Sequence, residues 1–351
     1  MKVLCLTKYD RLGASSRLRF YQYFSFFKDS GIQVTILPLL NDRYINALYK
    51  GRLAWGSVLS GYLRRLISFA VLYKYEVVWL EKEFFPWLPI WIELGLLPGK
   101  VKLVIDYDDA IFHQYDQHPF LIVRWLLGRK IDSVMKRADL VIVGNKYLAN
   151  RAKLAGACRI EILPTVVDIV KYKTDFSEPK KKVVIGWIGS PATAHYLKLI
   201  EPSIRKIKKI RDVEFRAIGA NPEQLSDIPL KVIQWTEQTE IIEIQKFDIG
   251  IMPLPDKLFE RGKCGYKLIQ YMACGKPVVA SPVSANKEIV RNGVDGYWAS
   301  SLSEWEASLI LLIDNLEKRR EMGMAGRNRV EEFYSIQKAA PRMIKLFYSV
   351  V

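Results

Sequence analysis

The stretch that decides the fold runs from residue 262 to residue 281 and has the sequence GKCGYKLIQYMACGKPVVAS. This pattern predicts a glycine-rich loop, a short helix between Gly265 and Gly275, and a buried parallel strand over 278–280. A helix that opens on glycine and lysine combines unpaired N–H groups with positive charge, which suits a phosphate group. The spacing alone is equally compatible with an ordinary connection between a helix and a strand.

The composition indicates a folded protein with two domains. The chain has 351 residues, which is too long for one typical core, and 50% of them are apolar. No uninterrupted apolar run reaches the roughly 18 residues of a membrane span, and the amino terminus lacks the pattern of a signal peptide. The cysteines are few and scattered and form no Cys-x-x-Cys pair. These features predict a protein of the reducing cytoplasm.

The formal net charge of +16 predicts an anionic partner. Residues 43–75 contain six basic side chains and no acidic one, and aromatic side chains lie between them. Basic residues mixed with interfacial aromatics suit a helix that lies on an anionic membrane surface. A solvated helix whose aromatics pack inward is the alternative. An RNA-binding surface is a further alternative, but no known nucleic-acid motif accompanies the segment, so we do not expect a nucleic-acid partner.

Short β-branched runs alternate with helical patterns along the chain, which predicts parallel sheets built from βα units. The expected fold class is α/β, with two Rossmann-like, doubly wound domains facing a cleft. The first domain covers 1–165 and the second covers 183–335, and residues 166–182 form a linker because they have no apolar period. Strands are expected at 2–7, 32–37, 76–80, 101–105, 139–143 and 159–162, and then at 183–188, 213–218, 230–233, 247–251, 277–280 and 296–299. Ligands in such sheets bind beyond the carboxyl ends of the strands.

The loop after the first expected strand combines small residues with arginines at a helix start. Gly13 precedes Ser15 and Ser16, either of which can cap the helix, and Arg17 and Arg19 follow. The loop therefore predicts a contact to a phosphate or an acceptor, with a plain capped helix bearing surface arginines as the alternative. It is neither Gly-x-Gly-x-x-Gly nor a P-loop, so the nicotinamide and ATP motifs are missing.

Three carboxylates follow the strand expected at 101–105. Asp106, Asp108 and Asp109 would lie at the edge of the sheet that binds ligands, where their mutual repulsion is costly unless something offsets it. A metal site and an acid/base group with a raised pKa are the two functional interpretations. The alternative is that one aspartate caps the next helix and the others are solvated.

The second half of the chain resembles the family 4 glycosyltransferases, which are retaining enzymes of the GT-B fold that use nucleotide sugars. The matching elements occur in the family's order: the strand and Gly-Ser turn at 184–190, then 247–254, 271–281, 286–290 and 292–296. The loop at 13–19 resembles that of bacterial capsule and O-antigen enzymes of this group. The family's two glutamates are replaced, since Gln270 and Gly262 stand in their positions.

The resemblance assigns roles to individual residues. It implies that Lys267, Arg261 and Lys263 bind the donor diphosphate together with the Gly189–Ser190 turn and the N–H groups after Gly265. Gln270 would accept hydrogen bonds from the ribose, and Trp235 would flank the base or serve only in packing. The residues expected to act in catalysis are Asp108, Asp109 and Lys267, without a metal and without a cofactor other than the donor substrate.

The resemblance further implies transfer of a sugar to a lipid-linked or growing cell-surface polysaccharide. The enzyme would lie at the cytoplasmic face of the membrane and contact its anionic surface through 43–75, and the last helix, 336–351, would cross back to the first domain. Two alternatives stay open: a sugar-nucleotide epimerase on the same fold, and a degenerate transferase kept as a nucleotide-sugar-binding or scaffolding subunit.

Overall fold

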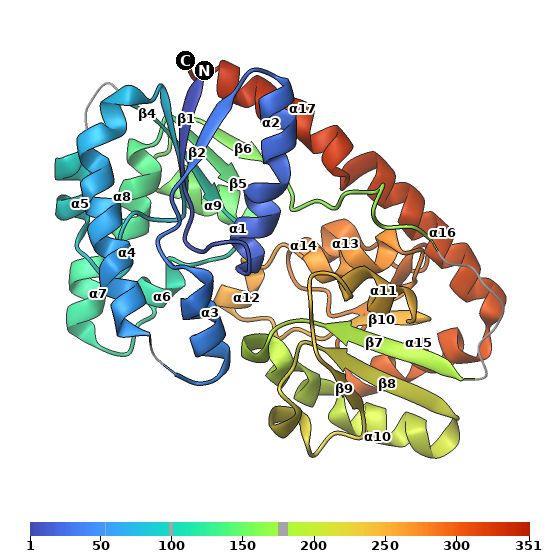
Figure 1. Ribbon diagram of the computed structural model, residues 1–351. Helices are drawn as coiled ribbons and strands as arrows, with labels where there is room; N and C mark the ends of the chain where they lie inside the picture. The colour runs from blue at the N-terminus through green and yellow to red at the C-terminus, as the bar shows by residue number, and fades with distance from the viewer. Residues whose placement is uncertain (53, 98–100, 175–181) are drawn as a thin grey trace. The chain divides into compact units, whose positions relative to one another are not determined.

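The computed structural model describes residues 1–52, 54–97, 101–174 and 182–351, which form two compact units. The first unit contains Met1–Thr165, Arg261–Cys264 and Ala339–Val351, and the second contains Val166–Glu260 and Gly265–Lys338. Each unit is built on one six-stranded sheet in which every strand pair is parallel (Figure 1). The α/β class with two Rossmann-like domains is therefore confirmed.

The sheet of the first unit has the strand order β2-β1-β3-β4-β5-β6. Its strands are β1 (Lys2–Leu6), β2 (Gln33–Ile36), β3 (Val77–Glu81), β4 (Lys102–Tyr107), β5 (Leu140–Val143) and β6 (Ile160–Ile162). Its helices are α1 (Ala14–Arg19), α2 (Phe24–Asp29), α3 (Asp42–Tyr49), α4 (Trp55–Ser68), α5 (Ile90–Leu96), α6 (His113–Asp116), α7 (Leu121–Leu127), α8 (Lys130–Arg137) and α9 (Lys146–Leu154), with 3₁₀ turns η1 (Tyr21–Tyr23) and η2 (Phe69–Lys74). The central strands are buried on both faces, as parallel sheets require.

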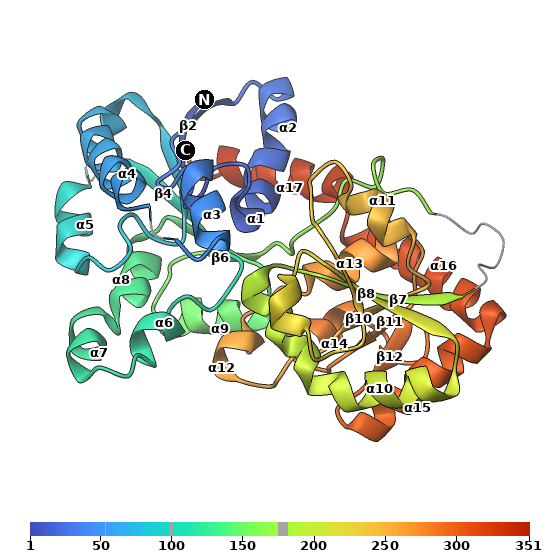
Figure 2. The same ribbon diagram turned by 60° about the horizontal axis from the view of Figure 1, so that its bottom comes forward.

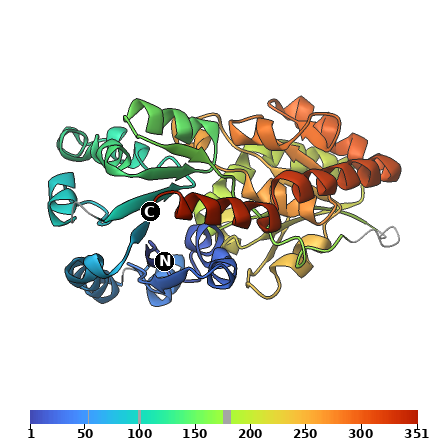
Figure 3. The same cartoon turned by 90° about the horizontal axis from the view of Figure 1, so that it is seen from above.

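The last helix, α17 (Ile336–Tyr348), completes one face of this sheet. From Ala339 onward the chain belongs to the first unit, where the Phe347 ring lies 5.0 Å from the Trp79 ring of β3. The Tyr348 hydroxyl donates a hydrogen bond of 2.6 Å to the Ser30 carbonyl just after α2. Seen from above, the red end of the chain accordingly lies beside the blue amino-terminal helices (Figure 3). The predicted return of the last helix to the first domain is confirmed.

The sheet of the second unit has the order β12-β11-β10-β7-β8-β9. Its strands are β7 (Val183–Ile188), β8 (Val213–Ile218), β9 (Lys231–Ile233), β10 (Ile249–Met252), β11 (Val278–Ala280) and β12 (Gly296–Trp298). Its helices are η3 (Pro191–Ile200), α10 (Glu201–Ile210), η4 (Pro222–Leu225), α11 (Glu240–Gln245), α12 (Leu258–Arg261), α13 (Tyr266–Ala273), α14 (Ala285–Ile289), α15 (Leu302–Asp314) and α16 (Leu316–Phe333). Helices α10 and α15 cover one face and α11 and α13 the other (Figure 2), each over its own hydrophobic core.

Part of the stretch predicted as a linker packs into the second unit. Val167 and Tyr172 are buried in one of its cores. The Val167 N–H donates to the Tyr334 carbonyl at 3.0 Å, and the Ile336 N–H donates to the Val167 carbonyl at 2.8 Å. The absence of an apolar period did not reveal this packing, because the partners lie more than a hundred positions away in the sequence. Residues 175–181 of the predicted linker lie outside the described residues.

Candidate functional site

In the second unit, the turn after β7 brings a glycine and a helix start together. A Cβ atom on Gly189 would lie 2.3 Å from the Trp187 ring and 2.8 Å from Thr193 Oγ1, so only glycine fits there. Ser190 follows as the residue that caps η3, and its carbonyl accepts a hydrogen bond from the Thr193 N–H at 2.9 Å. The turn lies at the carboxyl end of a parallel strand, where ligands of such sheets bind.

Lys267 lies beside this turn. Its Nζ is 4.2 Å from the centre of the Trp187 ring and 3.5 Å from Thr193 Oγ1. It stands in the first turn of α13, the helix predicted to follow Gly265, and Gly265 itself has a left-handed conformation (φ +64°). The predicted Lys267, Gly189 and Gly265 thus lie on adjoining elements, and the cation–π contact holds the ammonium group in place.

Gln270, on the buried side of α13, is held by a network of polar side chains. Its Nε2 donates to Glu240 Oε1 at 2.8 Å and to the Tyr172 hydroxyl at 2.9 Å. Trp235 Nε1 donates to the other oxygen of Glu240, Oε2, at 2.6 Å. The structure therefore places a carboxylate next to the position where the resemblance expects a glutamate. Glu240 was missed because it lies thirty residues before Gln270 and belongs to another helix.

Arg261 and Lys263 lie on a segment that belongs to the first unit. Asn145 Nδ2 donates to the carbonyls of Gly262 at 3.0 Å and of Lys263 at 3.1 Å. A Cβ atom on Gly262 would approach the backbone nitrogen of Ala110 to 2.4 Å and its Cβ to 2.5 Å. This close packing explains why glycine stands where the family has a glutamate, because no side chain fits.

In the first unit, the loop after β1 anchors two carboxylates of neighbouring strands. A Cβ atom on Gly13 would lie 2.3 Å from Tyr9 Cβ, so the loop needs glycine. Ser15 Oγ donates to Asp108 Oδ2, and Ser16 Oγ donates to Glu81 Oε2 at 2.6 Å. The predicted helix cap is thus not the role of either serine, because both hydroxyls bond to carboxylates.

The two arginines of this loop have different environments. Arg17 is half-buried and donates to the Arg11 carbonyl at 3.2 Å. Arg19 is buried and forms a two-pronged ion pair with Asp106, with distances of 2.7 and 2.9 Å. It also donates to the Leu163 carbonyl at 2.7 Å. Arg19 and Asp106 are therefore a structural pair, and neither is placed to bind a ligand.

Lys82 offsets the repulsion between the remaining aspartates. Its Nζ lies 2.9 Å from Asp108 Oδ1 and 2.9 Å from Asp109 Oδ2. Burial acts to lower the pKa of Lys82, but Asp108 and Asp109 outweigh it and hold that pKa well above its usual range. Burial acts to raise the pKa of Asp108, but Lys82 and the Ser15 hydrogen bond lower it to about 2. Asp108 is an ionised carboxylate, so the interpretation of a raised pKa is wrong for it.

A raised pKa is found at Asp106, where burial outweighs the opposing effect of Arg19 and raises the pKa to about 6, and also at Glu81, at the end of β3. Burial raises the pKa of Glu81 to about 7 against the opposing effect of Lys82. Glu81 Oε2 accepts hydrogen bonds from Ser16 Oγ and from the Lys8 N–H at 2.7 Å, whereas Oε1 is buried with no hydrogen-bond partner among the described residues. The run Glu81-Lys82-Glu83 at a strand end is the signal in the sequence that could have indicated these residues.

No group of three or more histidine, cysteine, aspartate or glutamate side chains is arranged to hold a metal ion in the ranges that the structure describes. His113 bonds through Nδ1 to Asp116 at 2.8 Å and through Nε2 to the Tyr147 hydroxyl at 2.7 Å. Both ring nitrogens of this histidine therefore form hydrogen bonds with neighbouring side chains.

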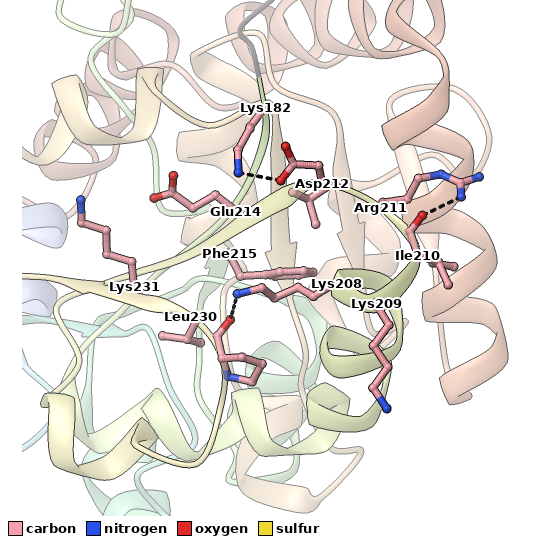
Figure 4. Close-up of a pocket in the computed structure, with 12 residues that line it drawn as sticks. Lys182, Lys208, Lys209, Ile210, Arg211, Asp212, Glu214, Phe215, Leu230 and Lys231 are labelled. Carbon is pink, nitrogen blue, oxygen red and sulfur yellow. Dashed lines mark hydrogen bonds and ion pairs between the residues drawn. The ribbon is translucent and has the colours of Figure 1, made fainter.

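An open basic pocket of about 940 Å³ lies at the opposite edge of the second sheet, where β7, β8 and β9 begin (Figure 4). Several of its cations are already engaged: Lys182 pairs with Asp212 at 2.6 Å, and Lys208 donates to the Pro229 carbonyl at 2.9 Å. Because ligands of parallel sheets bind beyond the carboxyl ends of the strands, we do not assign the site to this pocket.

Part of the second unit matches a known protein family. Residues 182–315 match the family described as glycosyl transferases group 1. N-acetyl-alpha-D-glucosaminyl L-malate synthase of Bacillus anthracis is 22% identical over 205 residues, which are 52% of this chain and 51% of that protein. The matched stretches span between 24% and 54% of the length of the curated relatives.

Solved structures match the fold over the whole chain. Sucrose-phosphate synthase from Thermosynechococcus elongatus has a TM-score of 0.73 at 12% identity, covering 100% of this chain and 99% of that one. The Anabaena protein HepE, solved in complex with UDP-glucose, has a TM-score of 0.71 at 14% identity, covering 100% of both chains. The fold is thus that of the GT-B glycosyltransferases, as predicted.

Proposed function

We propose that this chain is a glycosyltransferase that moves a sugar from a nucleoside diphosphate, with retention, to a lipid-linked or growing cell-surface polysaccharide of the capsule or O-antigen type. The observation that carries the proposal is Lys267 beside the Gly189–Ser190 turn, within the residues that match the group 1 family. The UDP and UDP-glucose complexes of the Anabaena protein support a nucleotide-sugar donor.

The donor side is assigned to the second unit. When the bond between the anomeric carbon and the diphosphate oxygen breaks, negative charge develops on the leaving diphosphate. Lys267 Nζ and the N–H groups at the start of α13 offset this charge, so no metal or further cofactor takes part in the proposed reaction. The acceptor hydroxyl oxygen then bonds to the anomeric carbon, and its proton passes to the diphosphate oxygen.

The ribose is assigned to Gln270 and Glu240 together. Gln270 fixes the Glu240 carboxylate through a hydrogen bond of 2.8 Å, and Trp235 fixes it from the other side. A carboxylate accepts hydrogen bonds from ribose hydroxyls more strongly than an amide does. In this proposal Glu240 supplies the charge that Gln270 lacks, and the Trp235 ring flanks the base.

The acceptor side is assigned to the first unit, with Asp108 and Asp109 contacting the acceptor hydroxyl or the donor sugar. Lys82 and Ser15 hold the ionised Asp108 in one orientation. Gly13 and Arg17, two positions before and after Ser15, are included in this proposed contact. Arg261 and Lys263 are proposed as further diphosphate contacts, and Asn145 holds the carbonyls of Gly262 and Lys263 on their segment.

The membrane contact is assigned to 43–75 at the cytoplasmic face. Arg43, Lys50, Arg52, Arg64 and Lys74 are exposed, whereas Arg65 is buried and donates to the Thr7 carbonyl at 2.6 Å. No helix among the described residues is both long and apolar enough to cross a bilayer. Because the exposed charges of 43–75 are cationic, sedimentation with vesicles should require anionic lipid and weaken with salt. Equal binding to neutral vesicles would contradict the electrostatic part of the proposal.

Turnover of nucleotide sugars by the purified protein tests the function. A transferase releases nucleoside diphosphate and forms a product with a retained anomeric configuration, both of which can be followed by NMR. The second candidate is a degenerate binding subunit, which the replacements at Gly262 and Gln270 favour; it would show saturable nucleotide binding without turnover. Interconversion of free nucleotide sugars would instead identify an epimerase.

A further inference from the structure

The first unit exposes large apolar side chains over helix α7. The exposed fraction is 73% for Leu121, 59% for Ile122 and 80% for Trp125, and Leu127 is the buried residue of the helix. A surface helix of a globular protein normally turns its apolar stripe toward the core. A helix that shows leucine, isoleucine and tryptophan to solvent therefore indicates a docking surface.

The same surface continues into two other segments. Trp91, in α5, is 69% exposed, and Trp87 precedes it. The rings of Trp87 and His118 lie 5.7 Å apart, and those of His118 and Phe120 lie 5.4 Å apart, which connects the tryptophans to the start of α7. Helices α4, α5 and α7 lie on the same side of the first unit in both views (Figures 1 and 2).

Helix α4 borders this surface through Tyr62. Its hydroxyl donates to the Pro86 carbonyl at 2.6 Å. At helical spacing, Trp55, Leu59 and Leu66 lie on the same side of α4 as Tyr62, and they are 71%, 74% and 48% exposed. We call the surface the apolar face. It consists of Trp55, Leu59, Leu66, Trp87, Trp91, Phe120, Leu121, Ile122 and Trp125.

The apolar face is held in shape from beneath. Lys130 is buried, and its Nζ lies 2.7 Å from Glu83 Oε2 and 2.7 Å from Glu93 Oε1. The Trp87 N–H donates to the Tyr115 hydroxyl at 3.1 Å. Because buried ions and hydrogen bonds fix the loop that carries Trp87, its exposure is part of the folded structure and not the result of fraying.

The charge pattern around the apolar face favours an anionic occupant. The stretches 43–75, 84–92 and 117–131 contain no aspartate or glutamate, although they are far apart in the sequence. Arg64, Arg124 and Arg129 are exposed cations of these stretches. Tryptophan and leucine flanked by arginine suit the boundary between headgroups and acyl chains of an anionic bilayer. The two carboxylates beside Arg124 and Arg129, Asp116 and Asp132, both pair with Arg151, at 2.9 and 2.6 Å.

We propose that the apolar face inserts into the surface layer of an anionic bilayer, with Leu121 and Trp125 of α7 as anchors. The choice of a bilayer rests on the proposed function, because a lipid-linked acceptor is confined to the membrane. The inference adds insertion to electrostatic attraction, and it adds α7, Trp87 and Trp91 to the basic segment 43–75.

The test compares the double variant Leu121→Ser/Trp125→Ser with Ile242→Ser/Leu311→Ser. The control pair lies on the second unit, and its side chains are 54% and 46% exposed. Flotation uses vesicles of phosphatidylcholine and phosphatidylglycerol at low and high salt. We expect the α7 variant to bind roughly 10- to 100-fold more weakly and to lose the binding that persists at high salt. The control should bind as the wild type does.

A second readout reports insertion directly. Brominated lipids should quench the tryptophan fluorescence of the wild type, and the quenching should be smaller in Trp125→Phe. Wild-type binding and quenching in the α7 variants would overturn the proposal. A dimer that the α7 double variant abolishes, found by analytical ultracentrifugation without vesicle binding, would also overturn it and assign the face to a second copy.

Turnover of nucleotide sugars in solution without lipid separates this inference from the proposed function. The α7 double variant should hydrolyse or transfer the donor as the wild type does. Vesicle binding without any turnover would remove the proposed function and leave the membrane surface. Turnover without vesicle binding would keep the proposed function and remove the membrane surface.

Discussion

At the scale of single residues, Lys267 connects the packing of the second unit to its proposed chemistry. The contact with Trp187 fixes the ammonium group 4.2 Å from the ring centre without neutralising its charge. A cation fixed in this way can stabilise a leaving diphosphate without reorganising during the reaction.

Lys267→Ala should lower kcat/KM for transfer roughly 100-fold or more, because one preorganised charge on the leaving group is lost. Its thermal midpoint should stay close to that of the wild type, since Lys267 is only half-buried. Lys287→Ala, an exposed lysine of α14, is the matched control and should leave the rate unchanged. A Lys267→Ala enzyme with near-normal rates would remove the diphosphate assignment.

Glu81 makes stability depend on pH. Its pKa is about 7 in the folded protein, against an ordinary value of 4.5. The native state therefore holds this proton more tightly than the unfolded chain. The contribution of Glu81 to the free energy of unfolding is fully present below about pH 4.5 and decreases as the pH rises to 7.

Glu81→Gln should remove this decrease, which is on the order of 1–3 kcal/mol. Relative to the wild type, the variant should gain stability between pH 5 and pH 8, measured as the difference in thermal midpoint at each pH. Glu317→Gln, an exposed carboxylate of α16, should show no such gain. The prediction fails if both variants follow the wild type in parallel.

At the scale of elements, local sequence rules predicted the segment from Gly265 to Ala280 well. Helix α13 begins right after Gly265, and strand β11 covers Val278–Ala280. Both Gly265 and Gly275 have positive φ values, which L-residues with side chains rarely adopt. Local sequence rules could not predict the position of the residues just before this helix. Their position depends on the contact of Gly262 with Ala110, about 150 positions earlier in the chain.

Gly262→Glu, which restores the glutamate of the family, should destabilise the protein by about 1–3 kcal/mol or more, because the new Cβ would meet the Ala110 backbone. Thermal denaturation measures the loss. Gly95→Glu is the control, since no atom lies within 4 Å of a Cβ built there. Unchanged stability together with raised activity in Gly262→Glu would contradict the packing explanation.

At the scale of the whole molecule, the chain places one parallel sheet in each unit, and the proposed donor site lies on the second. A ligand that binds only the folded protein stabilises it by mass action. At a concentration of 100 times Kd, this stabilisation amounts to about 2.7 kcal/mol. The rise in thermal midpoint that a nucleotide sugar causes can therefore identify the donor even when the acceptor is unknown.

A thermal-shift screen of nucleotide sugars should therefore find one donor that raises the midpoint by about 5 °C or more at saturation. The same donor should give a much smaller shift with Lys267→Ala and an undiminished one with Lys287→Ala. If no nucleotide sugar shifted the wild type, both the proposed function and the alternative of a binding subunit would be contradicted.

The sequence by itself determined the class of fold, because hydrophobic period, glycines and strand ends are local features that each element satisfies on its own. It also singled out Gly189, Gly265 and Lys267, which the structure places on adjoining elements. Only the tertiary structure decided which charged side chains pair with one another in the core. Arg19 pairs with Asp106, 87 positions away, and Lys82 pairs with Asp108. It likewise decided that Glu240 lies beside Gln270 and that α7 turns its apolar side chains outward. Local rules cannot assign such partners, because the free energy of a buried charge or an exposed tryptophan depends on distant segments that only the folded chain brings together.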